Sequence, residues 1–284
     1  TSLISLLLMS IRVSEAHVAW SALSALSCLA VIGISLRFPS LRKFPSNMLL
    51  WKTACDLMTS LVILGINVSL LLGEDDQQFP VGKRQFEVGS RLCSNGVLAG
   101  VMGFCLLASP GWFVTLAYNL NRSLHDPFTK PQSRMTKYHL WVWSTSLTAG
   151  VATGLLHEYR PNLHLCWSCH GLPASVNWLL LYGWLVAYWL LAAGYMVDAY
   201  FWTVHSRRVT ERLSSRSAQL RSSILYVAIF GLHWGLAAIT FGLIFGQPGF
   251  TSPTTAFTPA LLEYRLLFAA NLGLLGITDA ISWL

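Results

Sequence analysis

The sequence predicts an all-α integral membrane protein: a bundle of seven transmembrane helices with its N-terminus outside and its C-terminus inside. Of its 284 residues, 54% are hydrophobic and only 11% are charged, and the mean hydropathy is +0.53. A soluble globular domain carries about 25% charged residues, so the excess apolar surface must face lipid. Seven apolar stretches are long enough to cross a bilayer, and Lys and Arg gather in alternate loops between them.

Each predicted helix is an apolar run that meets the length requirement of about 20 residues. The seven runs cover, approximately, residues 13–36, 47–73, 91–121, 137–157, 175–205, 221–246 and 259–284. Only helices or closed barrels satisfy the backbone in lipid, and these runs are too long and continuous for barrel strands. We therefore expect a single seven-helix domain over residues 1–284.

The two ends of the chain leave alternatives open. Residues 1–10, TSLISLLLMS, are apolar but too short to span, and Ser14-Glu15-Ala16 resembles a small-x-small cleavage site. This stretch is either the remnant of a signal peptide or an outward extension of the first helix. Because the chain starts without Met and stops inside an apolar run, we expect a longer protein, in which a cytoplasmic or catalytic domain follows Leu284 as one alternative.

The charges of the loops predict the orientation. The loops at 37–52, 122–137 and 207–221 hold thirteen Lys and Arg residues against two acids, whereas the opposite side holds six Lys and Arg against seven acids. The positive-inside rule makes the first set cytoplasmic. The net charge of +7 then reflects topology and an anionic leaflet, so we expect a lipid bilayer as partner, no nucleic acid, and a multi-pass protein of the plasma membrane or an endomembrane.

The heptapeptide HLCWSCH at 164–170 contains the pattern C-x-x-C-H, which is the attachment signature of c-type haem. The predicted topology places Cys166 and Cys169 in the second outer loop and Cys93 at the outer end of the third helix. An oxidising compartment favours disulfides. We therefore expect Cys93 to pair with Cys166 or with Cys169, and this choice stays open.

Haem and zinc are the competing interpretations of the same heptapeptide. A haem needs a second axial ligand and a pocket, which a loop of this size hardly offers. The four zinc ligands that His164, Cys166, Cys169 and His170 would supply are cramped. We expect neither a metal nor another cofactor.

Several stretches resemble known receptors once the topology is drawn. Cys166-Trp167 resembles the Cys-Trp pair of secretin- and adhesion-type receptors. RKFPSNMLLWKTACDLMTSL, entering the second helix, and LAYNLNRSLHDPF, leaving the third, resemble the cyclic-AMP receptor family of slime moulds. Together with seven helices, these motifs resemble a G-protein-coupled receptor of the cyclic-AMP-receptor-like or secretin-adhesion-like branch. The chain lacks the Asp/Glu-Arg-Tyr and Asn-Pro-x-x-Tyr motifs of the rhodopsin-like class.

The resemblance implies a signalling receptor without catalysis of its own, which senses an extracellular ligand and acts on a heterotrimeric G protein or another cytoplasmic transducer. Such a receptor would line its outer cavity with Arg91, Asn95, Trp167, His170, Trp178, Tyr182, Glu263, Tyr264 and Arg265. It would present Arg122, Phe128, Arg134, Arg207, Arg208 and Arg212 to the transducer. The plainer alternatives are rim ion pairs for the outer set and positive-inside charge for most of the inner set.

Three acids inside the membrane are functional candidates, because an intramembrane carboxylate is costly. We expect Asp56, Asp198 and Asp279 to lie in the cytoplasmic third and to form a network with Asn119 and Asn271 that rearranges between two packings. The alternative is that each carboxylate is satisfied locally or extends towards water.

Other functions remain to be weighed against a receptor. A retinal protein needs a Schiff-base Lys inside the bundle, and the third, fifth, sixth and seventh helices contain none. A transporter is disfavoured because the sequence shows no internal repeat. The competing function is that of a membrane subunit, structural or haem-binding, of a larger complex.

Overall fold

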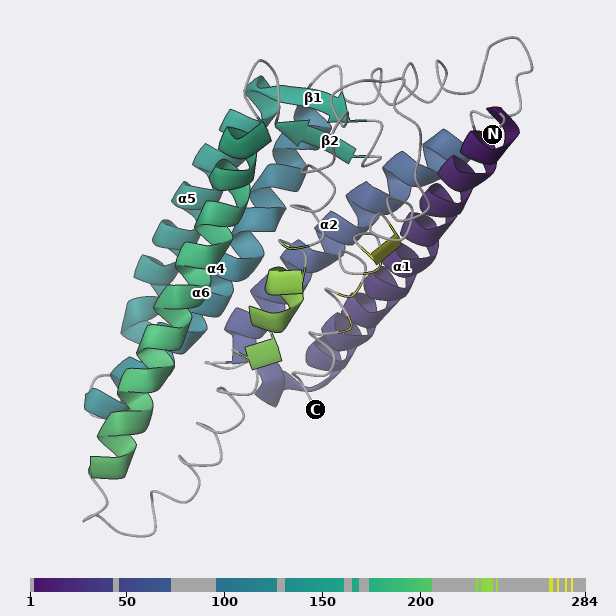
Figure 1. Ribbon diagram of the computed structural model, residues 1–284. Helices are drawn as coiled ribbons and strands as arrows, with labels where there is room; N and C mark the ends of the chain where they lie inside the picture. The colour runs from purple at the N-terminus through teal and green to yellow at the C-terminus, as the bar shows by residue number, and fades with distance from the viewer. Residues whose placement is uncertain are drawn as a thin grey trace.

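The computed structural model describes five long helices and a short hairpin, drawn in Figure 1. The helices are α1 (Leu3–Arg37), α2 (Ser46–Leu72), α4 (Val97–His125), α5 (Met135–Leu155) and α6 (Ala174–His205). The 3-10 turns η1 (Pro39–Arg42) and η3 (Pro131–Arg134) precede α2 and α5. The described residues are 3–42, 46–72, 96–126, 131–160, 165–168 and 174–205, with 228–229, 231–236, 239, 266–267, 270, 274 and 277.

The predicted positions of the first five helices are confirmed to within a few residues at most ends. The second predicted helix, 47–73, is shifted from α2 by one residue at each end. The fifth, 175–205, begins one residue after the start of α6 and ends at the same residue. α1 begins at Leu3, ten residues before the predicted start, so residues 3–12 continue the first helix at its N-terminal end. α4 begins at Val97 rather than near residue 91, and residues 91–95 lie outside the described part of the chain.

Four helical stretches are long and apolar enough to cross a membrane: Ser14–Arg37, Ser46–Leu72, Val97–His125 and Gly183–Trp202. The chain is therefore a multi-pass membrane protein. α5 has the length of a span but is less apolar, because it carries several Ser and Thr residues. Thr145, Thr148 and Thr153 donate their hydroxyl hydrogens to carbonyl groups one turn earlier in the same helix, which satisfies these groups without water.

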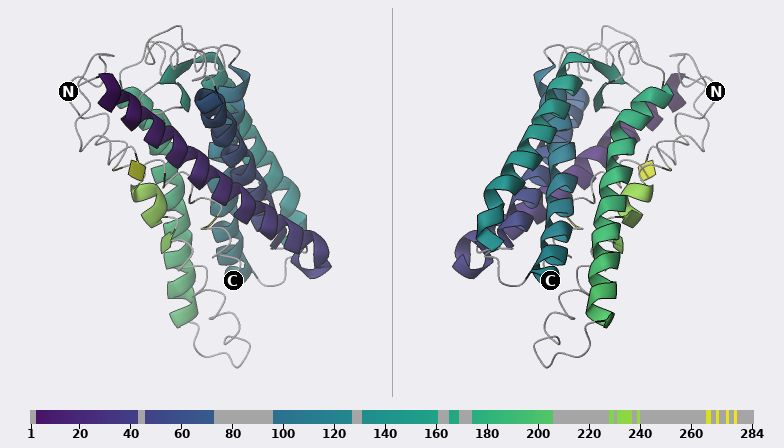
Figure 2. Two further views of the ribbon diagram at one scale, coloured as in Figure 1. Left: turned by 90° about the vertical axis from the view of Figure 1, so that its right-hand side faces the viewer. Right: turned by 90° about the vertical axis from the view of Figure 1, so that its left-hand side faces the viewer.

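The five helices alternate in direction, and α4 lies at the centre of the described bundle (Figures 1 and 2). α4 packs against α2, α5 and α6, and α1 packs along α2. The alternation brings the α1–α2 and α4–α5 connections and the end of α6 to one end of the bundle. Arg37, Arg42, Arg122 and Arg134 lie at this end, which we call the basic end.

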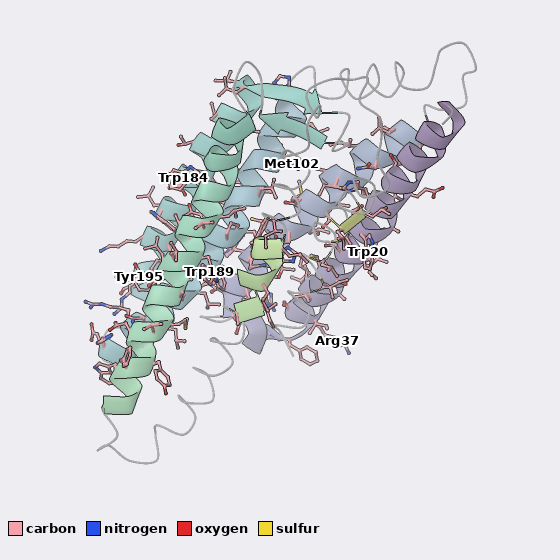
Figure 3. The ribbon with its side chains drawn as sticks, in the orientation of Figure 1. Trp20, Arg37, Met102, Trp184, Trp189 and Tyr195 are labelled. Atoms are coloured by element: carbon pink, nitrogen blue, oxygen red, sulfur yellow. The ribbon has the colours of Figure 1, made fainter. Side chains whose placement is uncertain are left out.

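The core of the bundle follows from the central place of α4. Apart from a few positions, its residues from Met102 to Leu124 are buried, which explains why its sequence reads as an almost unbroken apolar run. Leu106 and Phe113 pack with Ile63 and Ile66 of α2 and with Tyr188 and Met196 of α6 in one cluster. Figure 3 shows Met102 inside the bundle, and Trp184 and Trp189 along α6.

A second, aromatic group fills the contact between α2, α4 and α5. The rings of Trp51, Trp112 and Trp143 lie 5.5–6.5 Å apart between centroids, within the usual range for favourable aromatic pairs. The indole Nε1–H of Trp143 donates to Nδ1 of His139 at 2.9 Å. These contacts occupy the face of α4 opposite the cluster with α6.

The α4–α5 contact depends on glycines that let the two backbones approach. A Cβ placed on Gly150 would lie 2.9 Å from the carbonyl oxygen of Gly100 and 2.9 Å from Cβ of Phe104. Gly96, directly before α4, has φ 63°, a left-handed conformation that glycine adopts without strain. A Cβ there would also lie 2.2 Å from the carbonyl oxygen of Gly154. Close packing of small residues is a common way to join helices in lipid.

The described fold is all-α as predicted, and the loop after α5 adds a short two-stranded hairpin that the sequence did not predict. β1 (His157–Arg160) pairs antiparallel with β2 (Leu165–Ser168), and Tyr159 lies opposite Cys166. The hairpin covers the ends of α4 and α5 opposite the basic end (Figure 1). Pairing satisfies backbone groups that an irregular loop over the bundle would have to expose or bury. The alternation of residue types over four residues is too short to predict a strand.

Candidate functional site

The most deeply buried charges belong to a Lys–Asp pair on α2. Lys52 and Asp56 are four residues apart, so they lie one helical turn apart on the same side of the helix. The ammonium Nζ of Lys52 lies 2.6 Å from Oδ2 of Asp56, and the two side chains are 4% and 1% exposed. A charge inside the membrane is costly, and pairing reduces that cost. The pair therefore forms an ionic centre in a bundle that otherwise buries few charges in its described part.

Three other elements surround this ionic centre. The carbonyl oxygen of Asp56 accepts a hydrogen bond from Oγ of Ser60, and Oγ of Ser60 also pairs with Oγ of Ser24 on α1 at 2.8 Å. Cys105 of α4 is close enough for the charge of Asp56 to act on it. The charges of Lys52 and Asp56 also act on the imidazole of His233. Hydrogen bonds thus link the ionic centre to α1, and its charges reach Cys105 of α4 and His233 of the segment 231–236.

The segment 231–236 lies between the ionic centre and α6. His233 and Trp234 are buried. A Cβ on Gly231 would meet the indole of Trp189, so the absence of a side chain lets the segment lie directly on α6. Figure 3 shows Trp189 beside this segment. Close packing is thus found at Gly231, whereas Gly235 has no atom within 4 Å of a placed Cβ.

A second polar group, the inner clamp, joins α4 to α6 near the basic end. It consists of Asn121, His125 and Asp198. The amide Nδ2 of Asn121 donates to Oδ2 of Asp198 at 2.7 Å and to the carbonyl oxygen of Tyr195 at 3.0 Å. Nε2 of His125 lies 2.9 Å from the same carboxylate oxygen. Asn121 is buried, whereas the carboxylate of Asp198 is 61% exposed, so the clamp reaches from the core to the surface of the bundle.

A third polar contact joins α4 to α5 at the same level. The hydroxyl of Tyr138 donates to Oδ1 of Asn119 at 3.3 Å, and the ring of Tyr118 contacts both Tyr138 and Tyr195 edge-on. Arg134 lies 3.5 Å from Asp126 across the α4–α5 turn. The halves of α4, α5 and α6 nearest the basic end are therefore tied by a small number of specific polar contacts rather than by apolar packing alone.

The predicted network of three acids and two amides appears as separate groups in the described part of the chain. Asp56 pairs with Lys52, Asp198 bonds to Asn121, and Asn119 bonds to Tyr138. Asn271 and Asp279 lie outside the described residues. The carboxylate of Asp198 is exposed on the bundle and bonds to α4, and its predicted extension towards water stays a prediction.

The residues that sequence reasoning missed are the partners: Lys52, Asn121, His125 and Tyr138. For Lys52 a signal was present, because a Lys four residues before an Asp on one helix is the spacing of an ion pair. For Asn121 and His125 no signal existed, because their contact with Asp198 joins positions more than seventy residues apart.

The predicted outer cavity is described only in part. Trp167 lies on β2, and Trp178 and Tyr182 lie in the first turns of α6, at the end opposite the basic end. Arg91, Asn95, His170, Glu263, Tyr264 and Arg265 lie outside the described residues. The same holds for Cys93 and Cys169, so the predicted disulfide stays a prediction. Cys28, Cys55 and Cys105 are buried, as expected for core residues.

The predicted transducer surface is also described in part. Arg122 is exposed on the last turn of α4 and Arg134 is half-buried at the start of α5, both at the basic end. Phe128, Arg207, Arg208 and Arg212 lie outside the described residues. Among the described residues, no group of three or more His, Cys, Asp and Glu side chains is arranged to hold a metal ion.

Removing the amide of Asn121 tests the inner clamp. Asn121→Leu is expected to lower the free energy of unfolding by about 1 kcal/mol, because it removes the buried donor to Asp198 and to the carbonyl of Tyr195. Unfolding of the purified protein in mixed micelles measures this effect. Ser27→Ala is the matched control, since Ser27 is only partly buried and bonds to Leu23 within its own helix; equal effects of the two changes would contradict the clamp.

No family model matches the chain, and no curated protein is similar to it at a significant level.

Proposed function

We propose that the protein is a signalling receptor resembling the G-protein-coupled receptors, with seven helices, an outer N-terminus and an inner C-terminus. The observation that carries the proposal is the ionic centre: a buried Lys52–Asp56 pair on α2 that is joined to α1 through Ser60 and Ser24, with Cys105 of α4 and His233 within reach of its charges. A receptor needs packed helices with two discrete arrangements. Charges buried at a junction of four elements make the packing there depend on a few bonds, which a ligand at the other end of the bundle can bias.

The arrangement of the helices supports the proposed topology. The described connections rich in Arg lie at one end, as the positive-inside rule requires of cytoplasmic loops. Five alternating helices from an outer N-terminus bring the end of α6 to the inner side. The described helical residues 228–229, 231–236 and 239 fall inside the predicted sixth span, and 266–267, 270 and 277 fall inside the predicted seventh. With these two spans the chain ends on the inner side.

The inner clamp supports a transducer at the basic end. Asn121, His125 and Asp198 tie α4 to α6 close to the exposed Arg122. Separating the ends of these helices would break hydrogen bonds that the exposed Asp198 and His125 can replace with water at little cost. The structure thus offers a contact that opens more readily than apolar packing, at the surface where a cytoplasmic transducer would bind. We propose a heterotrimeric G protein as the transducer.

Nucleotide exchange on membranes tests the proposed function. Membranes that contain the protein, supplied with purified heterotrimeric G proteins, are expected to exchange GTP faster than membranes without it. Asp56→Asn is expected to change this basal rate severalfold, because it removes the charge that holds Lys52; Ser27→Ala, on an exposed face of α1, should not. The same rate with and without the protein, for every G protein tried, would contradict the proposal.

An absorption spectrum of the purified protein tests the competing haem subunit. A receptor without a cofactor is expected to absorb only in the ultraviolet, from its Trp and Tyr residues. A haem band in the visible region would instead favour the redox interpretation of the C-x-x-C-H pattern.

A further inference from the structure

We propose that His17 of α1 and Asn67 of α2 form a binding site for a single O–H group, supplied by a water molecule or by an alcohol of a bound lipid. Both side chains are buried, being 2% and 0% exposed. Nδ1 of His17 and Oδ1 of Asn67 have no hydrogen-bond partner among the described residues. The inference concerns the outer part of the α1–α2 contact and does not depend on the proposed receptor function.

The register of the two helices places these residues opposite each other. α1 and α2 are antiparallel neighbours (Figure 2), and Ser24 of α1 bonds to Ser60 of α2. His17 precedes Ser24 by seven residues, and Asn67 follows Ser60 by seven. Seven residues are two helical turns, so each residue lies on the same face as its Ser and about 10.5 Å further along the axis. In an antiparallel pair both steps lead to the same level.

The burial pattern agrees with this register. The buried positions of α1 are 14, 17, 21, 24, 25, 28, 31 and 35, and those on one face of α2 are 53, 56, 60, 63, 67 and 70. Alternating steps of three and four residues are typical of helices that pack along a common seam. On each of the two helices, this buried face contains one residue of the Ser24–Ser60 bond and one residue of the proposed site.

Other buried polar groups along this seam are satisfied, which distinguishes the pair. Ser21 donates to the carbonyl oxygen of His17, and Ser35 donates to that of Val31. The amide Nδ2 of Asn67 donates to the carbonyl oxygen of Ile63 at 2.9 Å. Two atoms on this face have no hydrogen-bond partner among the described residues: the acceptor Oδ1 of Asn67 and the ring nitrogen Nδ1 of His17. Buried polar atoms in lipid are rarely left unmatched.

The chemistry of the two atoms defines the ligand. Oδ1 of Asn67 only accepts, so its partner must donate a hydrogen. The ring nitrogen of His17 donates or accepts according to its tautomer. A single hydroxyl group does both, because it donates its one hydrogen to Oδ1 of Asn67 while its oxygen accepts a hydrogen from Nδ1 of His17. Because the charged residues Arg12 and Glu15 lie within about one turn of His17 on α1, the site is near one boundary of the membrane, within reach of lipid head groups and water.

Nitrogen-15 NMR of the histidine-labelled full chain in lipid nanodiscs tests the proposal. His17→Phe identifies the ring signals of His17 among those of the eight histidines. The signal of Nδ1 is expected to lie at a hydrogen-bonded position and to move in Asn67→Leu, which removes the acceptor at nearly constant volume. Ser24→Ala, two turns away on the same seam, should leave it in place. If Asn67→Leu does not fold, Asn67→Ala removes the same acceptor.

The source of the O–H group is decided by native mass spectrometry of the same samples. A bound alcohol-bearing molecule that is present in the unmodified protein and lost in Asn67→Leu identifies a lipid. No bound molecule, together with magnetisation transfer from water protons to His17, identifies water. A His17 signal at the position of an unbonded nitrogen, or one unaffected by both changes at Asn67, would overturn the proposal.

Discussion

Replacing Asp56 with leucine is expected to destabilise the protein by about 3–5 kcal/mol, the usual cost of removing one partner of a buried ion pair. The ammonium of Lys52 is 4% exposed and lies 2.6 Å from the carboxylate, so the change leaves an uncompensated charge inside the bundle. Unfolding of purified protein in mixed micelles measures the loss. The expected change is large enough to reduce the yield of folded protein from cells.

The double change Lys52→Met and Asp56→Leu tests whether the loss of stability comes from the unpaired charge or from the changed volume of the side chains. Replacing both partners with apolar residues removes the buried charge altogether, and such replacements are often neutral or stabilising. We therefore expect the double variant to recover most of the stability lost in the single variant. A double variant as unstable as Asp56→Leu would contradict an unpaired Lys52 charge as the cause of the loss.

Changing Gly150 to valine is expected to separate α4 from α5 at the middle of their contact. The new Cβ would lie 2.9 Å from the carbonyl oxygen of Gly100 and 2.9 Å from Cβ of Phe104, and neither neighbour is the flexible end of a side chain. Overpacking costs about 1–3 kcal/mol and occasionally more. Because backbone must move here, we expect a loss at or above the upper end of this range in the same unfolding assay.

Gly194→Ala is the matched control for the glycine contact. Gly194 lies inside α6, and nothing lies within 4 Å of a Cβ placed there. Alanine also has the higher helix propensity, by about 1 kcal/mol in a helix interior. The control should therefore be neutral or slightly stabilising. A neutral Gly150→Val variant would contradict the close approach of α4 and α5.

The sequence predicted the helices well because lipid imposes a simple requirement on them. A span must be long and apolar, so α2 and α6 could be bounded almost to the residue from hydropathy and from loops such as RFPSLRKFP. The hairpin β1–β2 was missed because its four-residue strands carry no periodic signal. The long apolar run of α4 indicated that this helix is buried. Its central position could not be predicted, because it depends on how α2, α5 and α6 pack around it.

The candidate site was predicted at the level of residues but not of partners. Asp56 and Asp198 were selected because a carboxylate in the membrane is costly, and both make specific polar contacts. The contacts themselves differ from the expected common network, since Asp56 is satisfied within α2 and Asp198 across to α4. Which side chains meet between helices depends on register and rotation about the helix axis, and hydropathy specifies neither.

The account depends most on the sidedness and number of the spans, which epitope tags at the two ends of the chain measure directly. Antibodies applied to intact cells, without membrane permeabilisation, are predicted to reach a tag before Thr1 and not a tag after Leu284; permeabilisation should expose the second. Access to both tags in intact cells, or to neither, would mean an even number of spans and would contradict the seven-helix receptor. Access to the C-terminal tag alone would place the basic end outside and contradict its role as the transducer surface.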